Sequence, residues 1–293
     1  MMAEDRERPV SGTIALTAAA MLAFAANSLL CRMALGGGLI DAASFTSVRM
    51  ISGAALLLLI VLPRWLRDRR RGGRPPWDLR MAAMLFAYMI CFSFAYLTLS
   101  AGTGALLLFG AVQLTMFVAA LRGGEYFPPL AWVGFALATT GLVYLVAPGV
   151  TAPDPVGALL MIAAGVAWGF YSLLGRGAPD SLGATAGNFL LGVPLVLGAS
   201  LVFAGELQFS RAGVLLAVLS GAIASGLGYV VWYAALRGLA ATQAATVQLS
   251  VPVIAAAGGA VLLSEPVTLR LLLASAATLG GIALVLLQRS RRR

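Results

Sequence analysis

The sequence predicts an all-α integral membrane protein with ten transmembrane helices, arranged as two inverted five-helix repeats. Of its 293 residues, 60% are hydrophobic and 11% are charged, and the mean hydropathy is +0.94. Soluble domains carry about 25% charged residues, and a core surrounded by water could not bury this much apolar surface. An internal repeat, described below, predicts the inverted arrangement.

Long apolar runs predict where the helices lie, since a spanning helix needs about 20 mostly apolar residues. Proline and glycine clusters separate most of the runs, and the first run is too long for a signal peptide, so we expect it to be retained. The predicted helices cover 11–34, 41–62, 79–100, 102–121, 128–146, 156–176, 181–203, 212–236, 241–263 and 267–287.

Basic residues predict the orientation. All twenty are arginines, and sixteen of them fall on one side if the ten helices are threaded with both termini inside. This bias is the positive-inside pattern. We therefore expect a multi-pass protein of the bacterial inner membrane with cytoplasmic N- and C-termini. Nucleic-acid binding is disfavoured, because the arginines are not interleaved with an aromatic platform.

The two halves of the chain resemble each other. An offset of 144 aligns Phe24–Arg32 with Trp168–Arg176, and both segments contain Ser-Leu-Leu-x-Arg. Further matches occur in the same order, with offsets that change only in loops. They pair Asp41 with Asp180, Arg49 with Asn188, Phe92 with Tyr229, Tyr96 with Tyr233, Glu125 with Glu265, and Gly141 with Gly281.

These matches predict a repeat over 1–147, a linker over 148–155 and a second repeat over 156–293. Each repeat holds five helices, and this odd number inverts the second copy in the membrane. Inverted repeats are typical of secondary transporters, which place the substrate site between the copies near mid-membrane.

Several motifs then resemble a known family, the EamA-like repeats of the drug/metabolite transporter superfamily. The first half contributes Ser47-Val-Arg-Met50, Gly124-Glu125 and Gly141-Leu142. The second half contributes Gln248-Leu-Ser-Val-Pro-Val253, Leu263-Ser-Glu265 and Gly281. The first half departs where Val112-Gln113 stands in place of the proline that would match Pro252. Overall likeness extends to the aromatic amino acid exporter branch, which implies an amino acid substrate.

No catalytic site is predicted. The chain has no histidine, and its acidic residues lie in loops and at helix ends, so neither a Ser/His/Asp set nor a mid-membrane carboxylate pair can form. Metal sites and cofactors are not indicated. Cys31 and Cys91 lie inside apolar runs and are expected to be small core thiols.

Polar residues near the middle of predicted helices are candidates for substrate binding, because they are costly within the membrane. Arg49 is either a counter-ion for a substrate carboxylate or a buried hydrogen-bond hub. Nearer the helix ends, Arg32 and Arg176 are explained by snorkelling, while Glu125 and Glu265 are expected to tie loops together, with a coupling-ion role as the alternative. The mid-helix candidates are Asn27, Arg49, Gln113, Asn188 and Gln248.

Aromatic side chains at helical spacing predict the cavity wall. Trp232, Tyr96 and Tyr233 lie nearer helix ends, and for all these rings lipid contact or an interfacial belt is the alternative. The wall candidates are Phe24, Tyr88, Phe92, Trp168, Tyr171 and Tyr229.

Two prolines, Pro194 and Pro252, each remove a backbone hydrogen bond and should kink their helices, serving as gating hinges or as static bends.

These features predict a transporter that exports neutral or aromatic amino acids and related metabolites by alternating access. It has no evident proton carrier, so we expect a facilitator, with lipid as its surroundings and a monomer as its state. The alternatives are a proton antiporter, an exporter of cationic drugs, nucleosides or sugar phosphates, a lipid-acting membrane enzyme, and a scaffold without flux.

Overall fold

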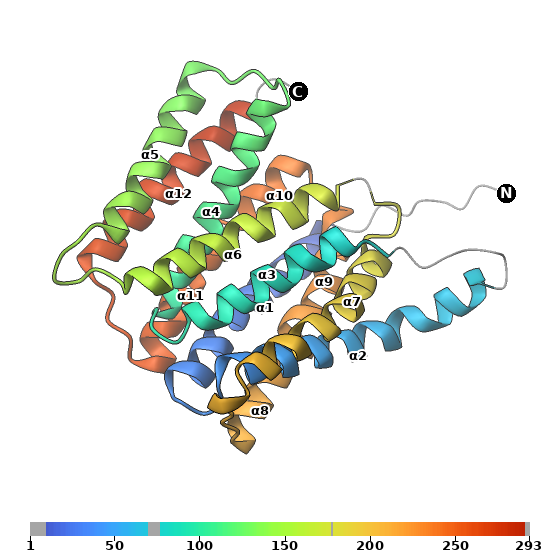
Figure 1. The fold of residues 1–293 in the computed structure, drawn as a ribbon. Helices are drawn as coiled ribbons and strands as arrows, with labels where there is room; N and C mark the ends of the chain where they lie inside the picture. The colour runs from blue at the N-terminus through green and yellow to red at the C-terminus, as the bar shows by residue number, and fades with distance from the viewer. Residues whose placement is uncertain (1–9, 70–76, 177, 291–293) are drawn as a thin grey trace, which may run out of the picture.

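The computed structural model describes residues 10–69, 77–176 and 178–290 and is built from helices (Figure 1). Some arginines used to predict the orientation, at positions 6, 8, 70, 71, 74 and 291–293, lie outside this part of the chain. The first five spans are α1 (Val10–Gly36), α2 (Ala42–Arg69), α3 (Leu79–Ala95), α4 (Ala101–Arg122) and α5 (Pro129–Val146).

The second half begins with α6 (Pro155–Leu174) and α7 (Ser181–Val202) and ends with α12 (Leu269–Ser290). Between them, two predicted spans are subdivided. The eighth comprises α8 (Arg211–Val218), the π-helix η2 (Leu219–Leu227) and α9 (Gly228–Leu236), and the ninth comprises α10 (Ala241–Val247) and α11 (Ser250–Leu263).

The prediction of a ten-helix membrane protein is confirmed. Within the described residues, nine helical spans are long and apolar enough to cross a membrane, and the tenth, Leu79–Ala95, is apolar but shorter at 17 residues. No strand occurs in the described ranges, where Ile40 and Phe209 form an isolated β-bridge. The division into two repeats at 148–155 remains a prediction.

Three predicted boundaries are wrong. α2 continues through Pro63 to Arg69, because a proline removes only the one helical hydrogen bond to the carbonyl four residues before it. The exposed Arg67 Nε donates to the Pro63 carbonyl at 3.3 Å. α3 ends at Ala95 instead of residue 100, because the Arg32 guanidinium binds the carbonyls of Tyr96 and Leu97 at 3.1 Å and satisfies the helix end.

The third correction is the break between α10 and α11. Pro252 has no N–H to donate to the Gln248 carbonyl, which instead accepts from Val251 at 3.1 Å. Leu249 likewise donates to the Thr246 carbonyl, three residues back, at 3.0 Å. The chain therefore makes tight turns at Gln248–Leu249. By contrast, α7 runs through Pro194 without a break.

Acidic side chains start several helices. Asp41, Asp78, Asp154 and Asp180 each accept a hydrogen bond from a backbone N–H in the first turn of the helix that follows, at 2.6–3.2 Å. Such caps satisfy amides that have no partner within the helix. These carboxylates are therefore used in building the fold.

The two halves interlock. α3 and α4 pack on α6, α2 packs on α7 and η2, and α1 packs on α9 and α11. Figure 1 shows α5 and α12 side by side at one edge of the bundle. A cavity therefore lies where helices of both halves meet.

Glycines explain the close α5–α12 contact. A Cβ at Gly134 would stand 2.6 Å from the Gly281 carbonyl oxygen, and one at Gly141 would stand 2.8 Å from the Thr278 nitrogen. Such distances exclude a side chain, so the two backbones touch directly. The Gly141 and Gly281 motifs of the sequence serve this contact.

Candidate functional site

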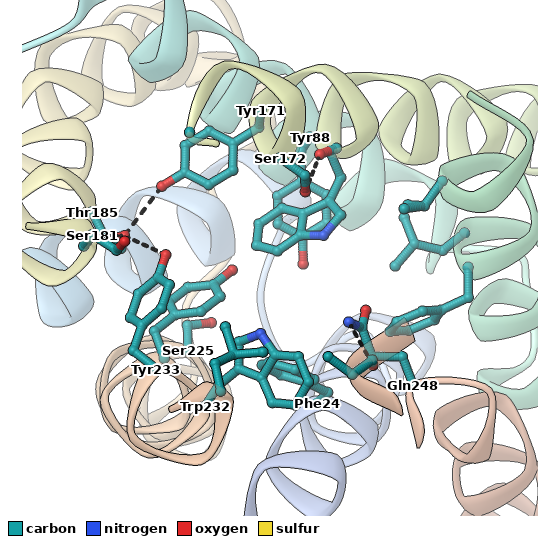
Figure 2. Close-up of a pocket in the computed structure, with 18 of the residues that line it drawn as sticks. Phe24, Tyr88, Tyr171, Ser172, Ser181, Thr185, Ser225, Trp232, Tyr233 and Gln248 are labelled. Carbon is teal, nitrogen blue, oxygen red and sulfur yellow. Dashed lines mark hydrogen bonds between the residues drawn. The ribbon is translucent and has the colours of Figure 1, made fainter. Parts of the chain in front are cut away.

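A cavity of about 420 Å³ lies between the two halves. Its wall includes Phe24 of α1, Tyr88 of α3, Gln113 of α4 and Trp168 of α6, and it is completed by residues of α7, η2, α9 and α10. Figure 2 shows the labelled side chains arranged around this space. Its volume falls in the range typical of small-molecule sites, about 300–1,000 Å³.

Aromatic rings form one connected wall. Trp168 lies at the centre, with its ring centroid 4.7 Å from Tyr88, 5.2 Å from Tyr171 and 5.5 Å from Tyr229. Phe24 extends the wall, 6.0 Å from Tyr229. Rings held at these spacings present a preformed surface suited to an apolar or aromatic ligand.

Hydroxyl and amide groups interrupt this wall. The Thr185 and Tyr233 hydroxyls lie 2.9 Å apart, and the Tyr171 hydroxyl donates to Thr185 at 3.4 Å (Figure 2). Gln248 Nε2 donates to the Ala244 carbonyl at 3.3 Å, while the Gln248 side chain lines the cavity. No Asp or Glu occurs among the described residues of the lining.

Arg49 lies directly behind the wall and is fully buried. Its Nη2 donates to the Tyr88 hydroxyl at 3.0 Å and to the Ser225 hydroxyl at 3.3 Å, and both of these residues line the cavity. The guanidinium carbon also lies 4.9 Å from the Phe92 ring centroid.

The charge of Arg49 is not matched by an acid. Within the described chain no carboxylate lies at salt-bridge distance, and Arg49 Nε and Nη1 have no hydrogen-bond partner there. A buried charge without a counter-ion is costly. An anionic group arriving at Tyr88 and Ser225 would therefore be attracted.

The π-helix η2 supplies polar partners at this depth. Ser220 donates to Asn27 Oδ1 at 2.7 Å, and Ser225 accepts from Arg49. In an α-helix two residues five apart point in different directions, whereas the wider i→i+5 winding brings them close to one face. A Cβ at Gly221 would collide with the Arg49 carbonyl oxygen, so η2 also touches the α2 backbone.

One end of the cavity is sealed. At this closed face Arg32 Nε lies 3.0 Å from Glu265 Oε1, and Glu265 Oε2 accepts from the Ala101 amide at 2.8 Å. Together with the Arg32 bonds to the α3 end, these contacts join the ends of α1, α3 and α11 to the start of α4. The Arg32 and Glu265 side chains are 23% and 13% exposed.

The opposite end is open. Here the lining reaches the α6–α7 connection, where Gly175, Ala178 and Ser181 line the cavity beside the exposed Arg176. Leu236, at the end of α9, completes this open face. The cavity is thus accessible from one end of the bundle and closed at the other.

Comparisons with known proteins agree with this architecture. Residues 155–287 match the EamA-like transporter family. The chain belongs to this family. It is 54% identical to the uncharacterized protein PA1977 of Pseudomonas aeruginosa, over 97% of this chain and 98% of that protein. A solved crystal structure has 21% sequence identity and a TM-score of 0.65, covering 96% of this chain and 99% of its own, which shows a shared fold.

Membership of the EamA-like family confirms the expectation of a multi-pass membrane transporter instead of an enzyme. In the described part of the chain, no group of three or more His, Cys, Asp or Glu residues lies close enough to hold a metal ion.

In this EamA-like protein, most of the predicted site residues lie together. The residues that line the cavity are Phe24, Asn27, Tyr88, Phe92, Gln113, Trp168, Tyr171, Tyr229 and Gln248.

Arg49 and Asn188 do not line the cavity. They are both fully buried one layer behind it, and each donates to a tyrosine hydroxyl of the wall: Arg49 to Tyr88, and Asn188 to Tyr171 at 3.4 Å. Asn188 Oδ1 has no partner among the described residues. Their position behind the rings depends on side-chain packing that helix spacing does not encode.

Several lining residues were not among the predicted site. Thr185 precedes Asn188 by three residues, so the two share a helix face, and Tyr233 follows Tyr229 by four; spacing alone pointed to both. Ser225 precedes Tyr229 by four residues and shares its helix face, so the same spacing pointed to it as well. Snorkelling, the role that the sequence predicts for Arg176, does not account for its position at the mouth of the cavity.

Proposed function

We propose that the protein exports neutral or aromatic amino acids and related small metabolites through this cavity by alternating access. The connected aromatic wall around Trp168 carries the proposal, because it offers a preformed apolar surface on helices from both halves. Resemblance to the aromatic amino acid exporter branch supports the same substrate class and the outward direction.

The polar groups suit the other end of such a substrate. A carboxylate at Tyr88 and Ser225 would lie next to the buried Arg49 charge, within reach of a charge-assisted hydrogen bond. An ammonium group would find the side-chain oxygens of Gln113 and Gln248 in the lining. A cationic drug is a poorer fit, because the described lining contains an arginine and no carboxylate.

We propose a facilitator, in which the substrate gradient drives transport. Proton-coupled transporters use an ionisable side chain within the membrane to carry the proton, and the described lining holds no carboxylate or histidine. In proteoliposomes, efflux should therefore continue at the same rate when an imposed pH gradient is removed. Its collapse would establish antiport instead.

For the setting, we propose the bacterial inner membrane, cytoplasmic termini and a monomer. Three arginines, Arg64, Arg176 and Arg237, lie at or next to the open face, and the positive-inside rule assigns such an end to the cytoplasm. In this orientation the cavity faces the cytoplasm, ready to load a substrate for export.

The deciding experiment measures uptake of radiolabelled tryptophan and phenylalanine into proteoliposomes that contain the purified protein. Saturable uptake, inhibited by unlabelled aromatic amino acids, is expected. Trp168→Ala should reduce it about tenfold or more, because three ring contacts are lost. Phe170→Ala is the matched control, since Phe170 is on the same helix but 46% exposed and outside the lining.

Competition then tests the substrate's charge. Phenylpyruvate and phenylalanine, which carry a carboxylate, should inhibit more strongly than phenethylamine, which carries only the ammonium. Stronger inhibition by phenethylamine would favour cation export and refute the amino acid assignment.

A further inference from the structure

The closed face is held by a single network, in which Arg32 and Glu265 are the charged pair. Both glutamate oxygens are used, one by the guanidinium and one by the first amide of α4. The guanidinium in turn holds the end of α3. Because four helix ends meet on two side chains, opening this face requires the pair to separate.

Each part of this network has an equivalent in the other half of the sequence. Arg32 aligns with Arg176, and Glu265 aligns with Glu125, in the two repeat matches described above. The end of α3 corresponds to the end of α9, and the start of α4 to the start of α10. All these equivalents lie at the open face.

Backbone geometry strengthens the match between the two glutamates. Each follows a residue in the left-handed conformation, Gly124 with φ 80° and Ser264 with φ 54°. For Ser264 this is uncommon, since a side chain disfavours positive φ. Each glutamate N–H also returns to its own helix, donating at 3.1 Å to Ala120 in one case and Gly259 in the other. Both carboxylates thus follow a left-handed turn that closes the end of a helix.

Helix packing follows the same symmetry. α1, which carries Arg32, packs on α11, which precedes Glu265. α6, which precedes Arg176, packs on α4, which precedes Glu125. The two arginine–glutamate pairs therefore occupy equivalent positions at opposite ends of the bundle. In the described structure Arg32 and Glu265 form an ion pair, whereas Arg176 and Glu125 do not form one with each other.

We propose that Arg176 and Glu125 form the second latch of the transport cycle. When the cavity opens at the now-closed face, Arg32 and Glu265 separate, and Arg176 pairs with Glu125 to seal the other end. Two latches of the same chemistry keep the two states close in energy, which a small ligand needs in order to shift the population. This inference rests on the alternating-access part of the proposed function and not on its substrate.

Two alanines provide matched reporters of the state. Ala245 lines the open cavity, and its repeat equivalent at an offset of 140, Ala105, is fully buried. In a background with Cys31→Ala and Cys91→Ala, a cysteine is placed at one position or the other. The rate at which this cysteine reacts with a water-soluble thiol reagent is measured. The rate at position 105 divided by the rate at position 245 reports the population of the state that is open at the now-closed face.

Glu265→Gln should raise this ratio about fivefold or more, while Glu125→Gln and Arg176→Gln should each lower it by a similar factor. Arg176 and Glu125 are exposed, so their variants retain the fold. The double variant with Glu125→Gln and Arg176→Gln should shift the ratio little further than either single variant, because both substitutions remove the same pair. Asp68→Asn is the control, an exposed acid outside both pairs, and should leave the ratio unchanged.

A shift in the same direction for Glu265→Gln and Glu125→Gln, or no shift for Arg176→Gln, would overturn the second latch. Labelling needs no substrate. If the ratios move reciprocally while no amino acid is transported, the latch stands and the proposed substrate fails. If amino acid transport is saturable but the ratios do not move, the proposed substrate stands and the second latch fails.

Discussion

The α5–α12 pair and the span made of α8, η2 and α9 differ in how regular their backbones are. α5 and α12 are unbroken α-helices that touch through Gly134, Gly141 and Gly281. In the other span the winding changes to a π-helix over Leu219–Leu227, where it packs on α2. Both lie in the same apolar bundle, but of the two only the span that contains η2 borders the cavity, through residues of η2 and α9.

This difference follows from what each region must satisfy. Regular helices bond all their backbone groups internally, so two of them can meet through small residues without polar side chains. Near η2 the buried charge of Arg49 and the amide of Asn27 need partners, and the wider winding supplies Ser225 and Ser220. Irregular backbone therefore marks the functional region, as is common for π segments.

The largest expected effect comes from Arg49. Arg49→Met keeps the length of the side chain but removes the charge behind Tyr88. Because a hydrogen bond to a charged group is worth about 1.5–3 kcal/mol, the KM for tryptophan in proteoliposome uptake should rise roughly 10–100-fold. Phenethylamine, which has no carboxylate, should be affected little.

Arg49→Lys is the companion variant, since it retains the charge but lacks the guanidinium, whose Nη2 reaches both Tyr88 and Ser225. Its KM should lie between those of the parent and Arg49→Met. If Arg49→Met instead lowers stability and leaves the KM of the remaining folded protein unchanged, Arg49 is a structural hub, the alternative that the sequence left open.

Substitutions between α5 and α12 should change the stability of the protein and not its substrate binding. A Cβ at Gly281 would meet Ala138 nitrogen at 2.5 Å as well as the Gly134 carbonyl, whereas a Cβ at the adjacent Gly280 meets nothing within 4 Å. Gly281→Ala should therefore reduce the free energy of unfolding by about 1–3 kcal/mol, measured by denaturation in mixed micelles. Gly280→Ala should be neutral or stabilising, and equal losses for both variants would contradict the close contact.

Sequence reasoning found the regular features better than the irregular ones. Apolar length located every span, and helical spacing brought Tyr88, Phe92, Trp168 and Tyr229 to one cavity, because both depend on α-helical periodicity. It missed the π-helix, and with it the way in which Ser220 and Ser225 come to face Asn27 and Arg49, since no residue pattern distinguishes a widened turn from an α-helical one. It also gave Arg32 and Glu265 separate roles, because their contact joins residues 233 positions apart.

A smaller effect is expected at Ser220. Ser220→Ala leaves Asn27 Oδ1 without its 2.7 Å hydrogen bond, and interhelical bonds in membrane proteins are worth roughly 0.6–1.7 kcal/mol. The free energy of unfolding should fall by that amount. Thr139→Ala on α5 is the control, because its hydroxyl bonds only within its own helix, to the Phe135 carbonyl. An equal decrease in the free energy of unfolding for both variants would show that the Ser220–Asn27 hydrogen bond adds no stability of its own.

The smallest effect concerns the break between α10 and α11. Pro252→Ala supplies an N–H for the Gln248 carbonyl and should allow one continuous helix, which moves the Gln248 side chain that lines the cavity. If the break is a hinge, the maximal transport rate should fall about threefold while the KM stays within a factor of about two. Pro194→Ala in the unbroken α7 should change the rate less. Unchanged rates for Pro252→Ala would make the break a static bend.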